Sequence, residues 1–232
     1  MTFIIAIQLN DSIIVTSDNK KVIVQETGKI QFSPEKTTKI HAWDKGIITG
    51  TGESHIVTRS IEFFKKVAQS NIKKLPQCLE ISRQIRELEI GTGYFQVENT
   101  KLLCSSYSEY GAQLYTIQRF NPSQPYELKA IKPMDITVWL FHPNIDAITT
   151  DLKNLYDDLK DYNAFTDTAD WINYYINRLA PIYQKQSQHD PLMSLSFDML
   201  FQNKDEYVFG HVPNTHETAL EFKEISSDSS SI

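Results

Sequence analysis

The first eighteen residues form the segment that most constrains the fold. Two apolar runs rich in β-branched residues, 3–9 and 13–17, are separated only by the polar stretch 10–12. This pattern predicts a tight β-hairpin whose two strands lie side by side. The second run ends at Asp18, so the hairpin returns this carboxylate to the start of the first strand, where Thr2 lies.

Thr2 can combine two chemical roles if Met1 is removed. Its small side chain is compatible with removal of Met1 by methionine aminopeptidase. An N-terminal threonine then carries a hydroxyl nucleophile and a free α-amine, whose ordinary pKa lies close to neutral pH and suits a general base. The alternative interpretation is that Thr2 merely begins a strand, so the hypothesis depends on the residues that surround it.

The next segments continue a recognisable order. The stretch 36–43 predicts a third strand, and 45–52 predicts a fourth that runs into a glycine turn before a helix beginning near Glu53. This order resembles the N-terminal half of proteasome β-type subunits and their bacterial relatives, the HslV peptidase and the Anbu proteins. That family has an N-terminal Thr, a hairpin ending in Asp, a Lys opening the next strand, and a glycine turn before the first helix.

The resemblance implies roles for four residues of this chain. Thr2 would attack the scissile carbonyl, Lys39 would lower the pKa of the Thr2 hydroxyl, and Asp18 would pair with Lys39. A backbone N–H at Gly50 would serve as the oxyanion hole. The spacing from Asp18 to Lys39 is slightly longer than usual in the family, which indicates an insertion in the intervening loop and leaves Lys36 as the alternative lysine.

The middle of the chain continues the resemblance, with one departure. Strands are expected over 100–106, 111–117 and 126–131. In the family, a Gly–Ser–Gly turn follows, and its serine supports the nucleophile. This chain has Lys132-Pro133-Met134-Asp135 in that place, so an active-site hydroxyl that the family provides is missing.

Near the C-terminus, Asp190 and Ser194 follow a long predicted helix and precede a strand expected over 195–201. In the family, an Asp at this junction and a Ser just after it form hydrogen bonds around the N-terminal Thr. The resemblance therefore assigns both residues to the catalytic site, although Ser194 lies one position beyond the usual spacing. Pro191 favours a turn directly after Asp190.

Helical periodicity completes the order of elements. Amphipathic helices are predicted over 54–68, 76–90, 146–162 and 171–186, the last with a kink at Pro181. Two helices thus fall between two groups of strands, and two follow the second group. The resemblance implies an α+β fold, the four-layer αββα sandwich of the N-terminal nucleophile (Ntn) hydrolases. We expect a single domain over 1–221 and a polar, disordered tail over 222–232.

Composition argues against several other classes of function. The formal net charge is −6 and there is no dense basic cluster, so a nucleic-acid partner is not expected. Neither a membrane span nor a signal peptide is evident. Cys78 and Cys104 lie far apart and the histidines are scattered, so we expect no disulfide, no metal, no other cofactor, and a reducing, cytoplasmic setting.

Two functions remain open from the sequence. The first is a proteasome-like threonine peptidase or amidohydrolase that cleaves peptide (amide) bonds of a peptide or protein substrate after removal of Met1. The second is a non-catalytic, proteasome-like assembly protein that keeps the fold but not turnover, which the missing serine at Pro133-Met134-Asp135 favours. In both cases the resemblance implies a homo-oligomer, either a ring or a stack.

Overall fold

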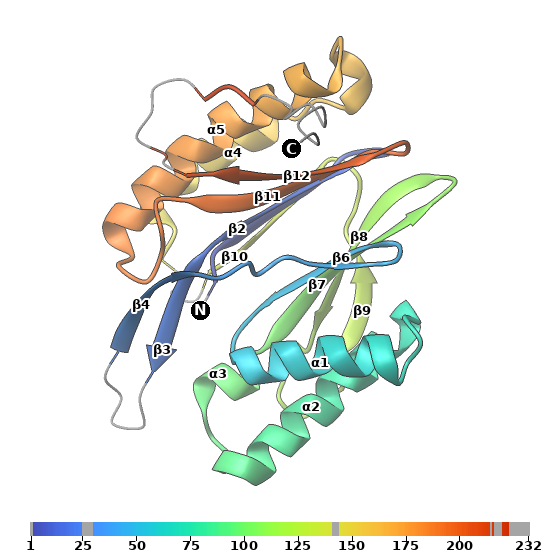
Figure 1. Ribbon diagram of the computed structural model, residues 1–232, viewed down its shortest axis with the longest axis vertical. Coiled ribbons are helices and arrows are strands. Elements are labelled where there is room, and N and C mark those ends of the chain that lie inside the picture. The colour runs from blue at the N-terminus through green and yellow to red at the C-terminus, as the bar shows by residue number, and fades with distance from the viewer. Residues whose placement is uncertain (1, 25–29, 141–143, 214, 216–219, 223–232) are drawn as a thin grey trace, which may run out of the picture.

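The computed structural model describes residues 2–24, 30–140, 144–213, 215 and 220–222. Their strands form two five-stranded antiparallel sheets and a separate two-stranded sheet, with helices on the outer faces of the two large sheets (Figure 1). The fold is therefore mixed, with antiparallel sheets and helices. Met1 and the predicted polar tail, apart from Phe222, lie outside the described residues.

The first large sheet is built around the N-terminal hairpin. Its strands, in spatial order, are β10 (Asp135–Trp139), β1 (Ile4–Gln8), β2 (Ile13–Asp18), β11 (Phe197–Gln202) and β12 (Tyr207–Val212). The turn closes through a hydrogen bond of 2.9 Å from the Leu9 N–H to the Ser12 carbonyl, as expected for a tight hairpin. Every residue of β1 and β2 is buried, because other elements cover both faces of this sheet.

The second large sheet follows the chain order. Its strands are β5 (His41–Trp43), β6 (Gly46–Thr51), β7 (Lys101–Ser108), β8 (Gly111–Gln118) and β9 (Glu127–Ala130). All four pairings in this sheet are antiparallel.

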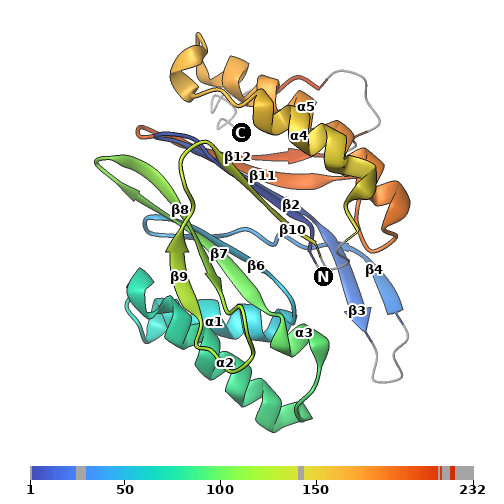
Figure 2. The ribbon, with the colours of Figure 1, turned by 180° about the vertical axis from the view of Figure 1, so that it is seen from behind.

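Helices from two separate parts of the chain cover the two sheets. Those on the second sheet are α1 (Ser54–Lys66), η1 (Ile72–Lys74), α2 (Leu75–Ile90) and α3 (Phe95–Glu98). Those on the first sheet are η2 (Asp146–Ile148), α4 (Thr149–Asp157), η3 (Tyr162–Ala164) and α5 (Thr168–His189). Figure 2 shows the two helical groups on opposite sides of the molecule, with both sheets between them.

Three apolar clusters hold these layers together, and the two-residue period of the strands distributes residues among them. Phe3, Ile5 and Ile7 pack toward α5, in a cluster that also contains Tyr183. In each strand of the hairpin, every second side chain, including that of Ile4, points instead to the opposite face of the first sheet. These side chains pack between the two large sheets. The third cluster joins the second sheet to α1 and α2. Burial of these apolar faces is the main source of stability for such a fold.

Side chains at the helix starts match the sequence pattern. The Glu53 carboxylate accepts a hydrogen bond from the Ile56 N–H, and the Asp167 carboxylate accepts one from the Asp170 N–H. Both are N-caps that satisfy donors left free in a first helical turn. No helix among the described residues is long and apolar enough to cross a membrane.

The structure corrects several expectations about individual elements. The insertion between Asp18 and Lys39 is no simple loop, because β3 (Lys20–Val24) and β4 (Ile30–Lys36) pair there as an antiparallel hairpin. The expected strand 36–43 is therefore divided: Lys36 ends β4, and only His41–Trp43 pairs with β6.

Two helices also differ from expectation. The helix predicted over 146–162 ends already at Asp157 in α4, and a separate single turn, η3, follows. The last long helix begins before Trp171 and continues through Pro181 to His189.

Candidate active site

Asp18 lies at the end of β2 and is almost completely buried, at 1% exposure. Its Oδ1 accepts a hydrogen bond of 2.8 Å from the Phe3 N–H, and its Oδ2 accepts one of 3.1 Å from the Lys20 N–H. The first bond crosses the hairpin from the peptide that directly follows Thr2. The hairpin therefore brings the carboxylate to the start of the chain and holds it there by backbone donors.

Lys39 is the lysine that contacts this carboxylate. Its Nζ lies 3.0 Å from both Asp18 oxygens, and its side chain is mostly buried. Burial lowers the pKa of the Lys39 ammonium, while the carboxylates of Asp18 and Asp198 act in the opposite direction and raise it. Lys36, the alternative lysine, is exposed, and its Nζ lies 3.2 Å from the His211 Nε2.

Thr2 is buried and contacts the second sheet. Only 8% of it is exposed, and its carbonyl accepts a hydrogen bond of 3.4 Å from the Thr51 hydroxyl. Thr51 is the last residue of β6, so the contact joins the start of the first sheet to the second sheet. This places the Thr2 backbone beside the glycine-containing segment that precedes α1.

Gly50 faces away from Thr2. A Cβ on Gly50 would lie 2.8 Å from the Lys101 carbonyl oxygen and 3.3 Å from the Val57 side chain of α1, which explains the glycine by close packing. Since side chains alternate along a strand, Thr51 is the neighbour that points toward Thr2. The signal for Thr51 in the sequence was its place between two glycines.

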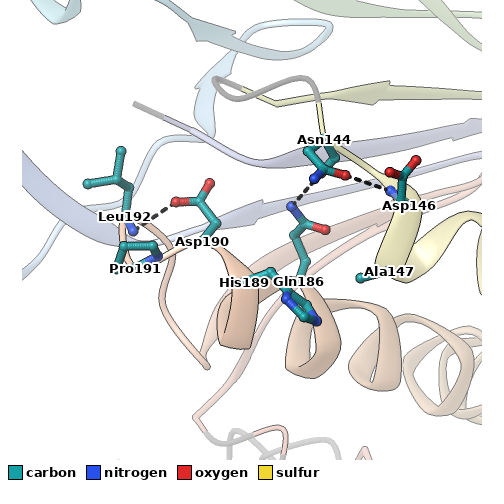
Figure 3. Close-up of a pocket in the computed structure, with 8 residues that line it drawn as sticks. All are labelled: Asn144, Asp146, Ala147, Gln186, His189, Asp190, Pro191 and Leu192. Atoms are coloured by element: carbon teal, nitrogen blue, oxygen red, sulfur yellow. Dashed lines mark hydrogen bonds between the residues drawn. The ribbon is translucent and has the colours of Figure 1, made fainter.

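Asp190 and Ser194 occupy different neighbourhoods. Asp190 follows the C-terminal end of α5, and its Oδ1 accepts a hydrogen bond of 2.9 Å from the Leu192 N–H (Figure 3). Ser194 accepts a bond of 3.1 Å from the Asn19 N–H and donates to the Asn19 Oδ1 at 3.0 Å. The described contacts thus connect Ser194 to the end of β2, while Asp190 stabilises its own turn.

Asn19 was not among the residues that the sequence singled out. It is 2% exposed and follows Asp18 directly. Its Oδ1 also accepts a hydrogen bond of 2.8 Å from the Ser196 hydroxyl, so two serines of the C-terminal loop bind one amide oxygen. This contact fixes the loop against the Asp18 end of the hairpin.

A second pair that sequence reasoning missed lies across β11 and β12. Asp198 and His211 are cross-strand partners, and the His211 Nδ1 lies 2.8 Å from the Asp198 Oδ1. On its other side, His211 Nε2 faces the Lys36 ammonium, which can only donate. The two residues are thirteen positions apart, and no sequence motif connects them, so the sequence did not predict the pair.

The turn that replaces the family's Gly–Ser–Gly contains a residue with left-handed backbone. Met134 has φ of 57°, a conformation that favours glycine. Asp135 uses its Oδ1 to accept a hydrogen bond of 2.8 Å from the Ile136 N–H at the start of β10. The turn therefore keeps a glycine-like backbone but provides no hydroxyl.

Asp190 also lines a pocket of about 740 Å³ between η2 and the C-terminal end of α5 (Figure 3). Its lining also includes Asn144, Asp146, Gln186 and His189. Within the described ranges, no group of three or more His, Cys, Asp or Glu side chains is arranged to hold a metal ion.

No protein-family model matches this sequence, and a search of curated proteins found no match. Solved structures, in contrast, share its fold. A mutant Anbu from Hyphomicrobium sp. strain MC1 aligns with a TM-score of 0.59 and 9% identity, over 91% of this chain and 87% of the other. Anbu from Pseudomonas aeruginosa, described as a helical assembly, aligns with a TM-score of 0.64 and 10% identity, over 90% of this chain and 86% of the other. The chain thus has the fold of the Anbu proteins, which are bacterial proteasome-type chains.

Proposed function

We propose that this protein is a threonine-type N-terminal nucleophile hydrolase that cleaves amide bonds in peptides after Met1 is removed. The observation that carries the proposal is the buried Asp18–Lys39 ion pair, which is hydrogen-bonded to the Phe3 N–H. A buried ion pair costs desolvation free energy and is weak evidence for stability alone. Its position next to Thr2 supports a catalytic use.

In the proposed reaction, the Thr2 α-amine takes the proton of the Thr2 hydroxyl as the hydroxyl oxygen attacks the substrate carbonyl. The amide C–N bond then breaks, the leaving amine takes that proton, and an ester to Thr2 remains. Water hydrolyses the ester and restores the hydroxyl. Lys39 supports this chemistry by placing a positive charge at the start of the hairpin, where Asp18 orients it.

The remaining residues of the site would act around the Thr2 hydroxyl and amine. We assign the oxyanion hole to a backbone N–H of the segment that includes Gly50, because the neighbouring Thr51 contacts the Thr2 carbonyl. Asp190 and Ser194 would position the α-amine from the C-terminal loop. The contacts of Ser194 with Asn19 support this role, since they bind the loop to the residue after Asp18.

The same proposal covers architecture and assembly. We assign the layers to the αββα sandwich of Ntn hydrolases, formed by one domain over 1–221. The helical assembly of the P. aeruginosa Anbu supports a homo-oligomer, a ring or a stack, for this chain. Cys78 and Cys104 are unpaired and buried, which supports a reducing, cytoplasmic setting.

One observation favours a second candidate function. The turn at 132–135 lacks the serine that the family uses, so the chain could be a non-catalytic assembly protein that keeps the fold. This alternative gives no reason for a buried Lys39 beside Asp18, since an apolar pair would fill the space at lower cost.

The test is the intact mass of the purified protein before and after incubation with a peptide epoxyketone, a probe for N-terminal threonine. The proposal expects a mass that lacks one methionine, then a single adduct on Thr2, and no adduct on a Thr2→Ala variant. A protein that retains Met1 and forms no adduct would support the assembly protein instead.

A further inference from the structure

The pocket beside Asp190 contains a buried acceptor without a donor. Gln186 is 2% exposed, and its Nε2 donates to the Asn144 carbonyl at 3.1 Å. Its Oε1 has no hydrogen-bond partner among the described residues. Figure 3 shows the Gln186 amide in the pocket wall, turned toward Asn144. A buried carbonyl oxygen left unsatisfied is unfavourable, so a ligand with an N–H or O–H donor would relieve this cost.

The other polar groups of the pocket favour a positively charged donor. Asp190 is buried and uses Oδ1 for the Leu192 N–H, which leaves Oδ2 for a second donor. Asp146, on the opposite wall, adds another carboxylate. An ammonium ion has three N–H donors and no acceptor, which matches a set of two carboxylates and one amide oxygen.

The rim of this pocket already binds an ammonium group of the chain itself. The Lys20 Nζ donates a hydrogen bond of 2.5 Å to the carbonyl of Pro191, which also lines the pocket. A ligand ammonium would therefore bind the carboxylates of Asp190 and Asp146 rather than this carbonyl.

Helix α5 connects the pocket to the residue that follows the proposed nucleophile. The Tyr183 ring of α5 contacts the Phe3 ring, with centroids 4.8 Å apart. Gln186 is three residues further along the same helix, on the neighbouring turn. A peptide bound with its scissile carbonyl at Thr2 could therefore extend one of its groups into this pocket.

We propose that the pocket formed by Gln186, Asp190 and Asp146 binds the ammonium group of a lysine side chain in a peptide substrate. The inference rests on the proposed function, because only a peptide hydrolase would bind this ligand as a substrate. It adds that this substrate is cationic, which the net charge of −6 also favours by attraction.

The test measures binding rather than turnover. Two short peptides that differ only in one lysine or norleucine are titrated calorimetrically into full-length Thr2→Ala protein, in which substrate cannot be consumed. We expect the lysine peptide to bind about tenfold more tightly, the effect of one hydrogen bond to a charged group. n-Butylammonium is titrated in parallel as a probe for free amines.

Variants then locate the effect. Gln186→Leu and Asp146→Asn should each reduce the preference for lysine, and Asp146→Asn lies on the surface, so it should fold even if Gln186→Leu does not. Asp151→Asn is the matched control, because it removes the same charge from α4 where Asp151 pairs with Lys185 outside the pocket lining. It should leave the preference unchanged.

Equal binding of both peptides, or a preference that survives both Asp146→Asn and a folded Gln186→Leu, would overturn the inference. Binding of n-butylammonium as tight as that of the lysine peptide would also overturn it, since the ligand would then be a free amine. Failure of the proposed function is seen separately, as absence of the epoxyketone adduct on the protein with Thr2 intact.

Discussion

Asp18 and Asp190 are both buried carboxylates, but the structure holds them in different ways. Asp18 accepts hydrogen bonds from two backbone N–H groups and from Lys39, whose position is twenty-one residues away. Asp190 accepts one from Leu192, two residues away. The end of β2 thus provides donors to both oxygens of Asp18, whereas among the described residues Asp190 has a donor at one oxygen only.

The largest effect should come from removing the nucleophile that both carboxylates are proposed to serve. Thr2→Ala should reduce peptide hydrolysis by at least about 1,000-fold, because no other hydroxyl would replace it. Steady-state kinetics and thermal unfolding of the same sample measure activity and fold. Thr2→Ser is the matched control and should retain turnover. Full activity of Thr2→Ala would refute the proposed mechanism.

Lys39→Met should remove the ion pair that distinguishes Asp18 from Asp190. It leaves the Asp18 carboxylate buried without its ion-pair partner, so the free energy of unfolding should fall by about 3–5 kcal/mol. Urea denaturation measures this change. Lys36→Met, a change of the same chemistry at an exposed position, should cost about 0.5 kcal/mol or less. Similar losses in the two variants would contradict the distinction between the two lysines.

Asp190→Asn should separate activity from stability. The asparagine carbonyl can still accept the Leu192 N–H, so the free energy of unfolding should change by no more than about 1 kcal/mol. Turnover should fall by about 100-fold, because the α-amine of Thr2 would lose its positioning carboxylate. A variant with normal kcat, measured on a minimal peptide substrate, would remove Asp190 from the mechanism.

Asp198→Asn tests a smaller effect, that of the second carboxylate that raises the pKa of Lys39. The Asp198 charge raises the pKa of the Lys39 ammonium, so its removal should lower that pKa further. If catalysis needs the protonated lysine, the alkaline limb of the pH–rate profile should move to lower pH. A profile that does not move would show that this charge has no effect on the reaction.

The lowered pKa of Lys39 also makes the free energy of unfolding depend on pH. Because the pKa of Lys39 is lower in the folded protein, the unfolded chain binds more protons between the folded and the unfolded pKa, and stability rises with pH in that window. In Asp198→Asn the window should begin at a lower pH. Urea denaturation at a series of alkaline pH values measures it.

The smallest expected effect concerns the cysteines. Burial raises the pKa of both the Cys78 and the Cys104 thiols, so neither should compete with Thr2 for an electrophile at neutral pH. Iodoacetamide labelling of the folded protein, followed by intact mass, should give little product. Rapid labelling would mean that an adduct must be mapped before it is assigned to Thr2.

Local pattern predicted most elements of the fold. The hairpin of β1 and β2 follows from alternating β-branched residues around a short polar turn, and α1 and α2 follow from their helical periodicity. The pattern failed between Asp18 and Lys39, where β3 and β4 form a hairpin. Pro34 lies within β4, and a proline weakens the strand signal of a run because it cannot donate a hydrogen bond to the ladder.

The sequence by itself determined the chemistry that is available near the N-terminus: a threonine, a hairpin and the aspartate that the hairpin returns to it. Tertiary structure alone decided that Lys39 rather than Lys36 contacts Asp18, and that the Gln186 oxygen lies buried without a donor among the described residues. The physical reason is that contacts within a hairpin depend on neighbouring residues. The other contacts depend on the strand register and packing of segments that lie far apart in the chain.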